Sequence, residues 1–356
     1  MTLTECTVSN NSSGGGGSGG TSSLSGGAGA SGGLGGGVCS TASLVLIGCT
    51  IVDNQTGPGG AGGWAASGQG GSGGPGGCGA GIFANGLLAL TNCTVAANFC
   101  GQGGAAGPGA WGAYGAGGVG GLGGGICSTG ATVVSCTIVS NTVGAGPPGF
   151  LGTHQDGSGG GVYAPYGSGF FLNDIIALNS ALTNGHGPDA YGTVNSAGHN
   201  LIGVTNDSSG FTSPGDLIGS ADFPLDPKLG PLAANGGPTL TMALLPGSPA
   251  LDTGNTSLAP NVDQRGFPRP AGLAADIGAF EYGSVMPTLE INRSDATGLD
   301  VVGSGNAGQS CRLLWSPDFS SWVPLATNQI RSEGTVRFHD TFTPGSALRF
   351  YRLVMP

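Results

Sequence analysis

The chain has 356 residues, of which 78 are glycine and only 8% are charged, far below the roughly 25% of an average protein. Residues 1–227 contain nine acidic side chains and no lysine or arginine, so this part of the chain lacks the charges that neutralise nucleic-acid phosphates. The same composition argues against polybasic attachment to anionic lipids.

A nine-residue pattern recurs five times, in steps of 43, 44, 43 and 38 residues. Each copy begins with an apolar residue and ends with asparagine, and its fourth position forms a cysteine slot. The cysteine slot holds Cys6, Cys49, Cys93 and Cys136, then Asp174, and the final position holds Asn11, Asn54, Asn98, Asn141 and Asn179. A fixed period of this length is typical of a repeat architecture.

Each copy closes a core of about 16–18 residues, such as residues 82–98, in which apolar side chains alternate with small or polar ones. Alternation over a few residues predicts short strands. Three short strands per rung on equivalent rungs predict an all-β fold, the right-handed parallel β-helix. Stacking about 4.8 Å apart would turn the cysteines into a buried column and the asparagines into a ladder of bonded amides. We expect both to be structural.

Glycine-rich inserts separate the cores, at about residues 12–37, 55–81, 99–125 and 142–161. They are either flexible linkers or polyglycine-II-like helices that run out and back with three residues per turn. Their similar lengths and lack of positive charge favour ordered helices that pack laterally. Aromatic residues in the inserts would pack against the coil or contact a ligand: Trp64, Trp111, Tyr114 and Phe150.

Residues 211–284 differ in composition, and we expect them to close the end of the β-helix. They contain, in order, the motifs DPKLGPL, NGGPT, PGSPALD, DQRGFPRP and DIGAFE. This order resembles the C-terminal end of bacterial secreted β-helix proteins with a choice-of-anchor Q domain. The rungs resemble repeats of polymorphic outer-membrane-protein and autotransporter-like adhesins. The resemblance covers about residues 1–282 and implies secretion and surface attachment, with no catalytic residues. The long glycine inserts depart from its usual pattern.

The charged residues of these motifs form a candidate capping cluster: Asp263, Arg265, Arg269, Asp276 and Glu281. The last rung of a β-helix leaves an open sheet edge, which ion pairs among these residues would help to cover. A metal or sugar site is the alternative. Residues 285–356 contain conventional strand patterns at short spacing, which predict a small antiparallel β-sandwich. The expected regions are therefore 1–210, 211–284 and 285–356.

Few residues in the rungs suit catalysis. A glycosidase needs carboxylates about 5–10 Å apart, whereas Asp53 and Asp174 would lie three rungs apart, about 15 Å. The histidines lack metal-ligand spacing, so we expect no metal and no cofactor. One outward threonine column would suit an ice-binding face, but it lacks a parallel second column: Thr7, Thr50, Thr94 and Thr137.

We therefore predict a non-enzymatic, secreted or cell-surface structural protein that acts as an adhesin, a stalk or an extracellular filament subunit. Its expected location is extracellular or on a bacterial cell surface. Its expected partners are further copies of itself or a cell-surface glycan, without nucleic acid and without a transmembrane segment. The alternatives are a pectate-lyase-like, carbohydrate-active β-helix enzyme and an ice-binding protein. Because the chain begins inside a rung, we also expect that a leader has been lost.

Overall fold

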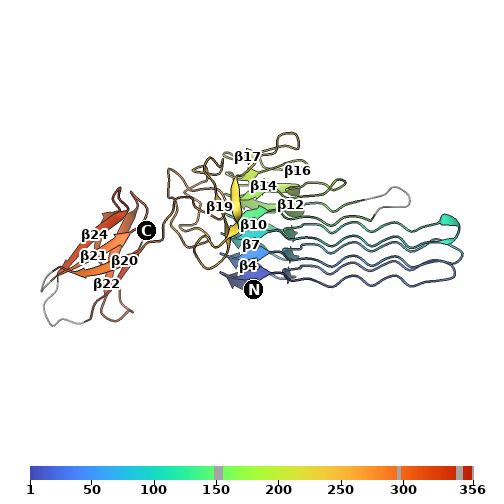
Figure 1. Ribbon diagram of the computed structural model, residues 1–356, viewed down its shortest axis with the longest axis horizontal. Helices are drawn as coiled ribbons and strands as arrows, with labels where there is room; N and C mark the ends of the chain where they lie inside the picture. Colours follow the sequence, from blue (N-terminus) through green and yellow to red (C-terminus); the bar gives the residue numbers. More distant parts are fainter. Residues whose placement is uncertain (148–154, 295–297, 342–347, 355–356) are drawn as a thin grey trace.

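The computed structural model describes residues 1–147, 155–294, 298–341 and 348–354, with only the backbone of residues 166–168. Figure 1 shows a stack of short strands with long inserts extending from one side and two small sheets on the other side. The predicted fold class is confirmed: a parallel β-helix with polyglycine-II-like inserts is followed by a small antiparallel sandwich.

Each full rung contains three short strands, and equivalent strands of neighbouring rungs pair in parallel. The first ladder contains β3 (Val38–Ser40), β6 (Ile82–Ala84), β9 (Ile126–Ser128), β12 (Val162–Leu172), β14 (Ala190–Ser196) and β16 (Ser208–Ser209). The second contains β1 (Thr2–Thr4), β4 (Leu44–Ile47), β7 (Leu88–Thr91) and β10 (Ala131–Val134). It then joins the first at the long strand β12, which pairs with both β9 and β10.

The third ladder contains β2 (Thr7–Ser9), β5 (Thr50–Val52), β8 (Thr94–Ala96), β11 (Thr137–Val139), β13 (Ile175–Ala177), β15 (Leu201–Ile202) and β17 (Leu217–Ile218). Register along the stack places like residues above one another: Leu46 pairs with Leu90, Leu90 with Val133, and Val133 with Phe171. All four side chains are fully buried. Burial of each such side chain contributes about 1.5–3 kcal/mol, so the hydrophobic effect holds the coil together.

Two corners of each rung use a left-handed backbone, at residues other than glycine except for Gly48. The residue before the cysteine slot is one, with φ of 51° at Asn92 and 53° at Ser135. The residue before the final asparagine is the other, with φ of 55° at Ala97 and 59° at Ser140. Each such conformation costs about 1–3 kcal/mol. The bend turns the following side chain inward, where its hydrogen bonds offset the cost.

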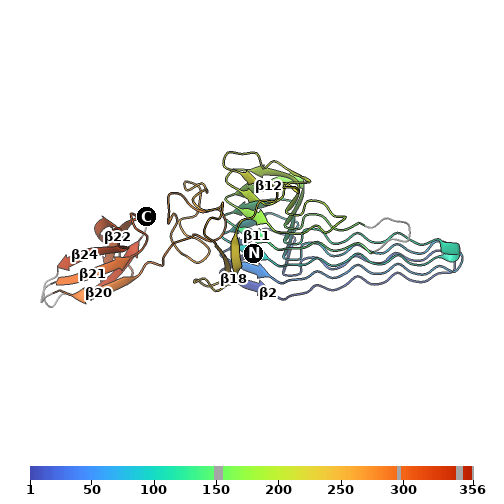
Figure 2. The same cartoon turned by 45° about the horizontal axis from the view of Figure 1, so that its top comes forward.

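The glycine inserts form a slab of two layers. Outbound segments, such as residues 55–64, make one layer, and return segments, such as residues 69–81, make the other. Figures 1 and 2 show the inserts side by side as they leave the coil, with the same shallow wave in each. The slab therefore continues the stacking of the rungs outward from the β-helix.

Backbone hydrogen bonds join the helices of the slab both within and between layers. Within a layer, Gly59 N–H donates to the Gln102 carbonyl at 2.8 Å. Between layers, Gly60 N–H donates to the Ala30 carbonyl, also at 2.8 Å. Since an extended helix of this type makes no internal hydrogen bonds, these contacts with its neighbours give the slab its order.

The three-residue turn decides where glycine is required. Every third residue of the second outbound segment is exposed: Gln55, Pro58, Ala61 and Trp64. The intervening positions face other helices, and a Cβ at Gly104 would lie 2.0 Å from the Gly60 carbonyl oxygen. At Gly17, on the edge of the slab, nothing lies within 4 Å of an added Cβ. Side chains are therefore admitted on the faces and the edge, whereas interior positions such as Gly104 have no room for one.

Residues 226–284 lie along the flank of the coil, which differs from the position expected for an end cap. Their hairpin of β18 (Leu229–Ala233) and β19 (Thr241–Leu244) is antiparallel, and the Leu240 carbonyl accepts the Thr50 hydroxyl at 2.6 Å. The end of the stack is formed instead by β17 and by residues 219–225, whose Leu225 N–H donates to the Gly203 carbonyl at 2.9 Å. The flank offers buried polar side chains as partners, as described below.

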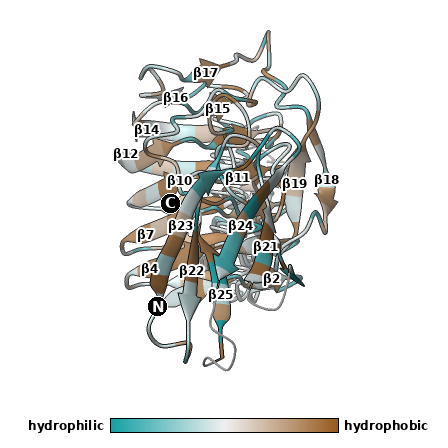
Figure 3. Ribbon diagram, turned by 90° about the vertical axis from the view of Figure 1, so that its left-hand side faces the viewer, coloured by the Kyte–Doolittle hydropathy of each residue, from teal (hydrophilic) through white to brown (hydrophobic). Residues whose placement is uncertain are grey.

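The C-terminal residues form two three-stranded antiparallel sheets. One contains β20 (Leu289–Arg293), β21 (Gly298–Ser304) and β24 (Thr335–Thr341), and the other β22 (Ser310–Ser316), β23 (Val323–Gln329) and β25 (Phe350–Val354). Alternate residues of β24 are buried, and Val336 and Phe338 pack with Cys311 and Leu313 between the sheets. Figure 3 views these sheets from their own end of the molecule, with hydrophobic and hydrophilic residues mixed along the strands. In the described part of the chain, no helix is long and apolar enough to cross a membrane.

Candidate functional site

The asparagine side chains form a ladder of hydrogen bonds that runs in one direction. Each Nδ2 donates to the next Oδ1, at 2.9 Å from Asn11 to Asn54, 3.0 Å to Asn98, 2.8 Å to Asn141 and 2.9 Å to Asn179. Each accepting Oδ1 also receives the backbone N–H of the preceding asparagine. All but Asn11 are buried. These amides are occupied in fixing the corner from which each insert departs.

The ladder ends on a carboxylate that the sequence repeat did not reveal. Asn179 Nδ2 donates to Asp189 Oδ1 at 2.9 Å, and Asp189 Oδ2 accepts the Val204 N–H at 2.7 Å. An ionised carboxylate only accepts hydrogen bonds, so Asp189 is the terminal acceptor of the asparagine ladder. Burial raises the pKa of Asp189 to about 6. Asp189 lies outside the nine-residue pattern, and only its three-dimensional position above Asn179 reveals its role.

The cysteines form a second buried column through the coil. Cys49 N–H donates to Cys93 Sγ and Cys93 N–H to Cys136 Sγ, each at 3.4 Å. Cys6, in the first rung, is partly buried. Burial raises the pKa of the Cys93 thiol well above its usual range. Because the thiolate is the nucleophilic form, the Cys93 thiol is a poor nucleophile at neutral pH.

Three further residues continue this column beyond the last cysteine. Cys136 N–H donates to Asp174 Oδ1 at 2.7 Å, Asp174 N–H to Asn200 Oδ1 at 3.0 Å, and Asn200 N–H to Asp216 Oδ1 at 3.0 Å. Burial raises the pKa of Asp174 well above its usual range. The sequence pattern located Asp174 but missed Asn200 and Asp216, because the later rungs are shorter and lack the inserts.

The five charged residues of the candidate capping cluster meet in one buried cluster beside the coil. Arg265 pairs with Asp263 at 2.7 Å and Arg269 with Glu281 at 2.9 Å. The Asp263 carboxylate also accepts the Glu281 N–H at 3.0 Å, and Asp276 accepts the Tyr282 N–H at 2.6 Å. Burial raises the pKa of Glu281 to about 7, against the opposing charge of Arg269. These contacts fold residues 263–281 into a rigid turn.

That turn is attached to the threonine column of the third ladder. Thr94 Oγ1 donates to Gln264 Oε1 at 2.6 Å, Gln264 Nε2 donates to Thr50 Oγ1 at 2.9 Å, and Thr137 Oγ1 accepts the Ala279 N–H at 3.0 Å. The three threonines are 0–1% exposed. This column was expected to face outward. It points away from the interior of the coil, but the flank segment covers Thr50, Thr94 and Thr137, and only Thr7 of the first rung is exposed.

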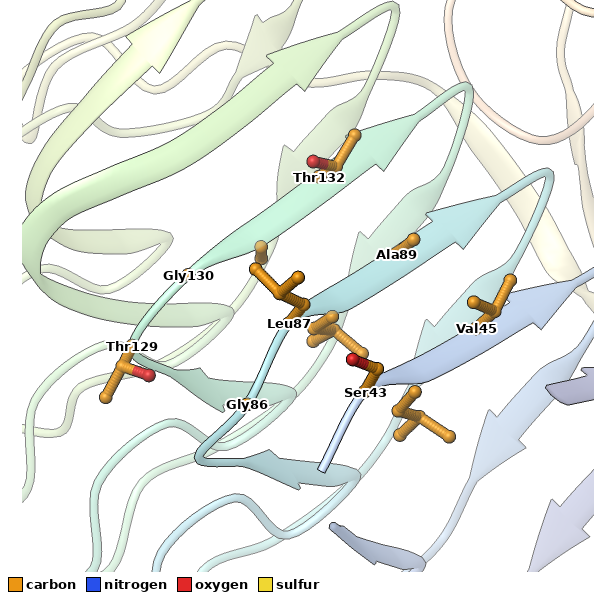
Figure 4. Close-up of a pocket in the computed structure, with 11 residues that line it drawn as sticks. Ser43, Val45, Gly86, Leu87, Ala89, Thr129, Gly130 and Thr132 are labelled. Carbon is orange, nitrogen blue, oxygen red and sulfur yellow. The ribbon is translucent and has the colours of Figure 1, made fainter. Parts of the chain in front are cut away.

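A concave groove of about 690 Å³ lies on the outer face of the second ladder. Figure 4 shows Val45, Ala89 and Thr132 projecting from successive strands, with Leu87 immediately before the strand that carries Ala89. The groove is lined by uncharged residues: Ser43, Leu44, Val45, Gly86, Leu87, Leu88, Ala89, Thr129, Gly130, Ala131 and Thr132. Its walls therefore supply no titratable group for acid–base chemistry.

The aromatic residues of the inserts are mostly solvent-facing. Trp111 is 101% exposed and Trp64 is 49% exposed, while Tyr114 is half-buried. Phe150 lies outside the described residues. Trp111 has a φ of 58° inside the short helix η1 (Ala110–Gly112), at the outer end of the slab in Figure 1. A bulky residue held in a left-handed conformation costs about 1–3 kcal/mol and is typical of functional positions.

Among the described residues, no group of three or more histidine, cysteine, aspartate or glutamate side chains could hold a metal ion. The fully exposed Trp111 makes the outer end of the slab the candidate site for recognition. No protein family, curated protein or solved structure matches the chain.

Proposed function

We propose that this protein is a non-enzymatic structural protein of the cell surface or extracellular space, in which the β-helix holds out a rigid glycine slab as an adhesive arm. The proposal rests on one observation: the fully exposed Trp111 lies at the outer end of an arm whose backbone is bonded in two layers. A rigid support reduces the entropy lost when such a side chain binds.

The proposed partner is a polysaccharide of a cell surface. The indole ring offers a flat, apolar face with one donor at its edge, which suits a ring that bears hydroxyl groups. The inserts 12–37, 55–81 and 99–125 carry no charged side chain, so an uncharged partner fits them best. The resemblance of the sequence to choice-of-anchor and autotransporter-like proteins adds support for secretion and surface attachment.

The test is a pull-down of the full chain on insoluble polysaccharides. The protein is labelled at Lys228, its only lysine, which is exposed and lies on the flank away from the slab. We expect retention on at least one of cellulose, chitin and peptidoglycan, with a loss of about tenfold in Trp111→Ala, as for a binding hot spot. The matched control is Phe223→Ala, which removes a side chain that is 82% exposed at the end of the coil. Equal retention of both variants would overturn the proposal, as would no retention of the native chain on any of the three.

Ice binding is the second candidate, and the flatness of the slab favours it. The return layer carries small uncharged outward residues in rows, among them Ala28, Ser72 and Ala116. The buried threonine column described above is no longer available for this role. A thermal-hysteresis measurement distinguishes this candidate: a freezing-point gap that is lost on placing glutamate at Ser72 would favour ice over polysaccharide.

A further inference from the structure

A column of large and small side chains runs up the outer face of the first ladder. Successive rungs pair Cys39 with Phe83, Phe83 with Cys127, Cys127 with Tyr163, and Tyr163 with Tyr191. None of these residues belongs to the asparagine ladder, the buried cysteine column, the flank cluster or the slab. Register fixes their order, so each side chain lies one rung from the next.

The upper part of this column is an aromatic stack. The rings of Tyr163 and Tyr191 are 5.3 Å apart between centroids and only 4° from parallel. This separation lies within the range of favourable aromatic pairs, about 4.5–7 Å. The rung spacing of the β-helix therefore suits rings that stack face to face along the column.

Below Tyr163 the stack is interrupted by a thiol. Cys127 occupies the position between Tyr163 and Phe83, and these two aromatic residues are two rungs apart, about 9.6 Å. The Cys127 thiol is hydrogen-bonded to Cys78, a residue of the preceding insert. Cys127 therefore has a short side chain between two neighbours that each carry an aromatic ring.

The space left above Cys127 is a cavity of about 120 Å³. Phe83 and Tyr163 line it together with Cys127, and the remaining lining residues are Ala84, Ser128, Thr129 and Pro165. No charged residue lines it. A ring placed midway would lie about 4.8 Å from each aromatic wall, close to the spacing of the tyrosine pair above it.

We propose that this cavity is a binding slot for one uncharged aromatic ring, held between Phe83 and Tyr163 over Cys127. The ring completes the stack at Cys127, where a thiol lies between two rungs that each carry an aromatic side chain. The apolar lining disfavours ions, because a charge there would lose its water without gaining a partner. It also favours aromatic rings over sugars, whose hydroxyls need several polar partners.

The test uses phenol as the probe and the full chain as the protein, with binding followed by saturation-transfer NMR. Cyclohexanol and methyl glucoside are the comparison probes. Cys127→Phe fills the slot with a ring from the chain itself and should abolish binding of phenol. The matched control, Cys39→Phe, makes the same exchange on the far side of Phe83 and leaves the slot open. Tyr163→Ala removes one wall and should weaken binding about tenfold, as expected for the loss of an aromatic pair.

Circular dichroism of each variant verifies that the coil is intact. The expected result is saturation transfer to phenol in the native chain and in Cys39→Phe, with none in Cys127→Phe. Unchanged phenol binding in Cys127→Phe would overturn the proposal, as would stronger transfer to methyl glucoside than to phenol. Absence of transfer to phenol from the native chain at about 10 mM would also overturn it, since such binding is weaker than about 3 kcal/mol. The slot is remote from Trp111, so failure here would leave the proposed adhesive function untouched.

Discussion

The rungs and the glycine slab share one stacking register but are stabilised by different interactions. In the rungs, apolar side chains such as Leu90 and Val133 fill an interior from which water is excluded. In the slab, glycine backbones approach closely enough that hydrogen bonds replace side-chain packing. A core of side chains can adjust to small changes of volume, whereas a contact between backbones leaves no atom that can move aside. The two regions should therefore respond differently to substitution, chemistry and pH.

The largest expected effect is on the rungs. Leu90→Ala removes a fully buried side chain from the middle of the stack and should lower the free energy of unfolding by about 2–5 kcal/mol. Urea denaturation followed by circular dichroism measures this loss. Leu87→Ala, at a position that is 76% exposed in the adjacent turn, should change the value by less than about 0.5 kcal/mol. A small effect at Leu90 would mean that the hydrophobic interior does not hold the rungs together.

The next largest expected effect is a difference in cysteine reactivity between the rungs and the base of the slab. The hydrogen bond from the Cys127 thiol lowers the pKa of Cys78 to about 7, and Cys78 lies partly exposed where the slab meets the coil. Cys93, inside the rungs, is buried with a raised pKa. At pH 7 we expect iodoacetamide to modify Cys78 at least about 50-fold faster than Cys93, from the thiolate fractions alone. Peptide mass spectrometry measures both rates, and Cys127→Ala should slow the reaction of Cys78. Equal rates at Cys78 and Cys93 would contradict this.

Much of the difference between the rungs and the slab could be predicted, because the sequence is periodic. The alternation around Cys93 and the recurrence of Asn98 predicted the strands and the columns, and the similar lengths of the inserts and their lack of positive charge favoured extended helices over flexible linkers. In the slab, glycine is required only where a position faces a neighbouring helix closely. The same position of the insert faces a neighbouring helix at Gly104 and an open edge at Gly17. The requirement for glycine therefore changes from one insert to the next.

In the slab, the addition of a single methyl group at an interior glycine should disturb the packing of the helices. Gly104→Ala places a methyl group 2.0 Å from the Gly60 carbonyl oxygen, so a row must shift and neighbouring hydrogen bonds must break. We expect a local loss of about 1–3 kcal/mol, seen as faster hydrogen exchange in residues 55–125, while the urea midpoint of the coil stays unchanged. Gly17→Ala, at the open edge, is the matched control and should leave exchange as it is. Similar exchange in both variants would show that the slab is looser than its hydrogen bonds imply.

The features that could not be predicted from the sequence depend on contacts between segments that are far apart along the chain. Gln264 accepts a hydrogen bond from Thr94, which lies 170 residues earlier in the sequence, and no local sequence pattern predicts that pairing. The flank position of residues 226–284 follows from it, since the threonine hydroxyls offer partners that the end of the coil does not. Asp189 and Asp216 end their columns in rungs too short to match the repeat, so their roles emerge only when the backbone is stacked.

The smallest expected effect is a pH dependence of stability that arises in the rungs and the flank cluster. Burial raises the pKa of Asp189 to about 6, above the ordinary value of 3.8, so the folded chain binds this proton more tightly than the unfolded chain. The stabilisation is fully present below pH 3.8 and is lost as the pH rises through 6. Asp189 alone should therefore make the coil about 1 kcal/mol more stable at pH 5 than at pH 7.

Urea midpoints at the two pH values measure the difference, and Asp189→Asn should reduce it. The variant keeps an acceptor for Asn179 but turns an amide toward the Val204 N–H, so its stability should also be lower at both pH values. Asp174 and Glu281, whose pKa values burial also raises, should retain part of the slope. The inserts 12–37, 55–81 and 99–125 contain no carboxylate, so these three inserts should show no such gain. A slope unchanged in Asp189→Asn would place the titrating group elsewhere and leave Asp189 ionised at the end of its ladder.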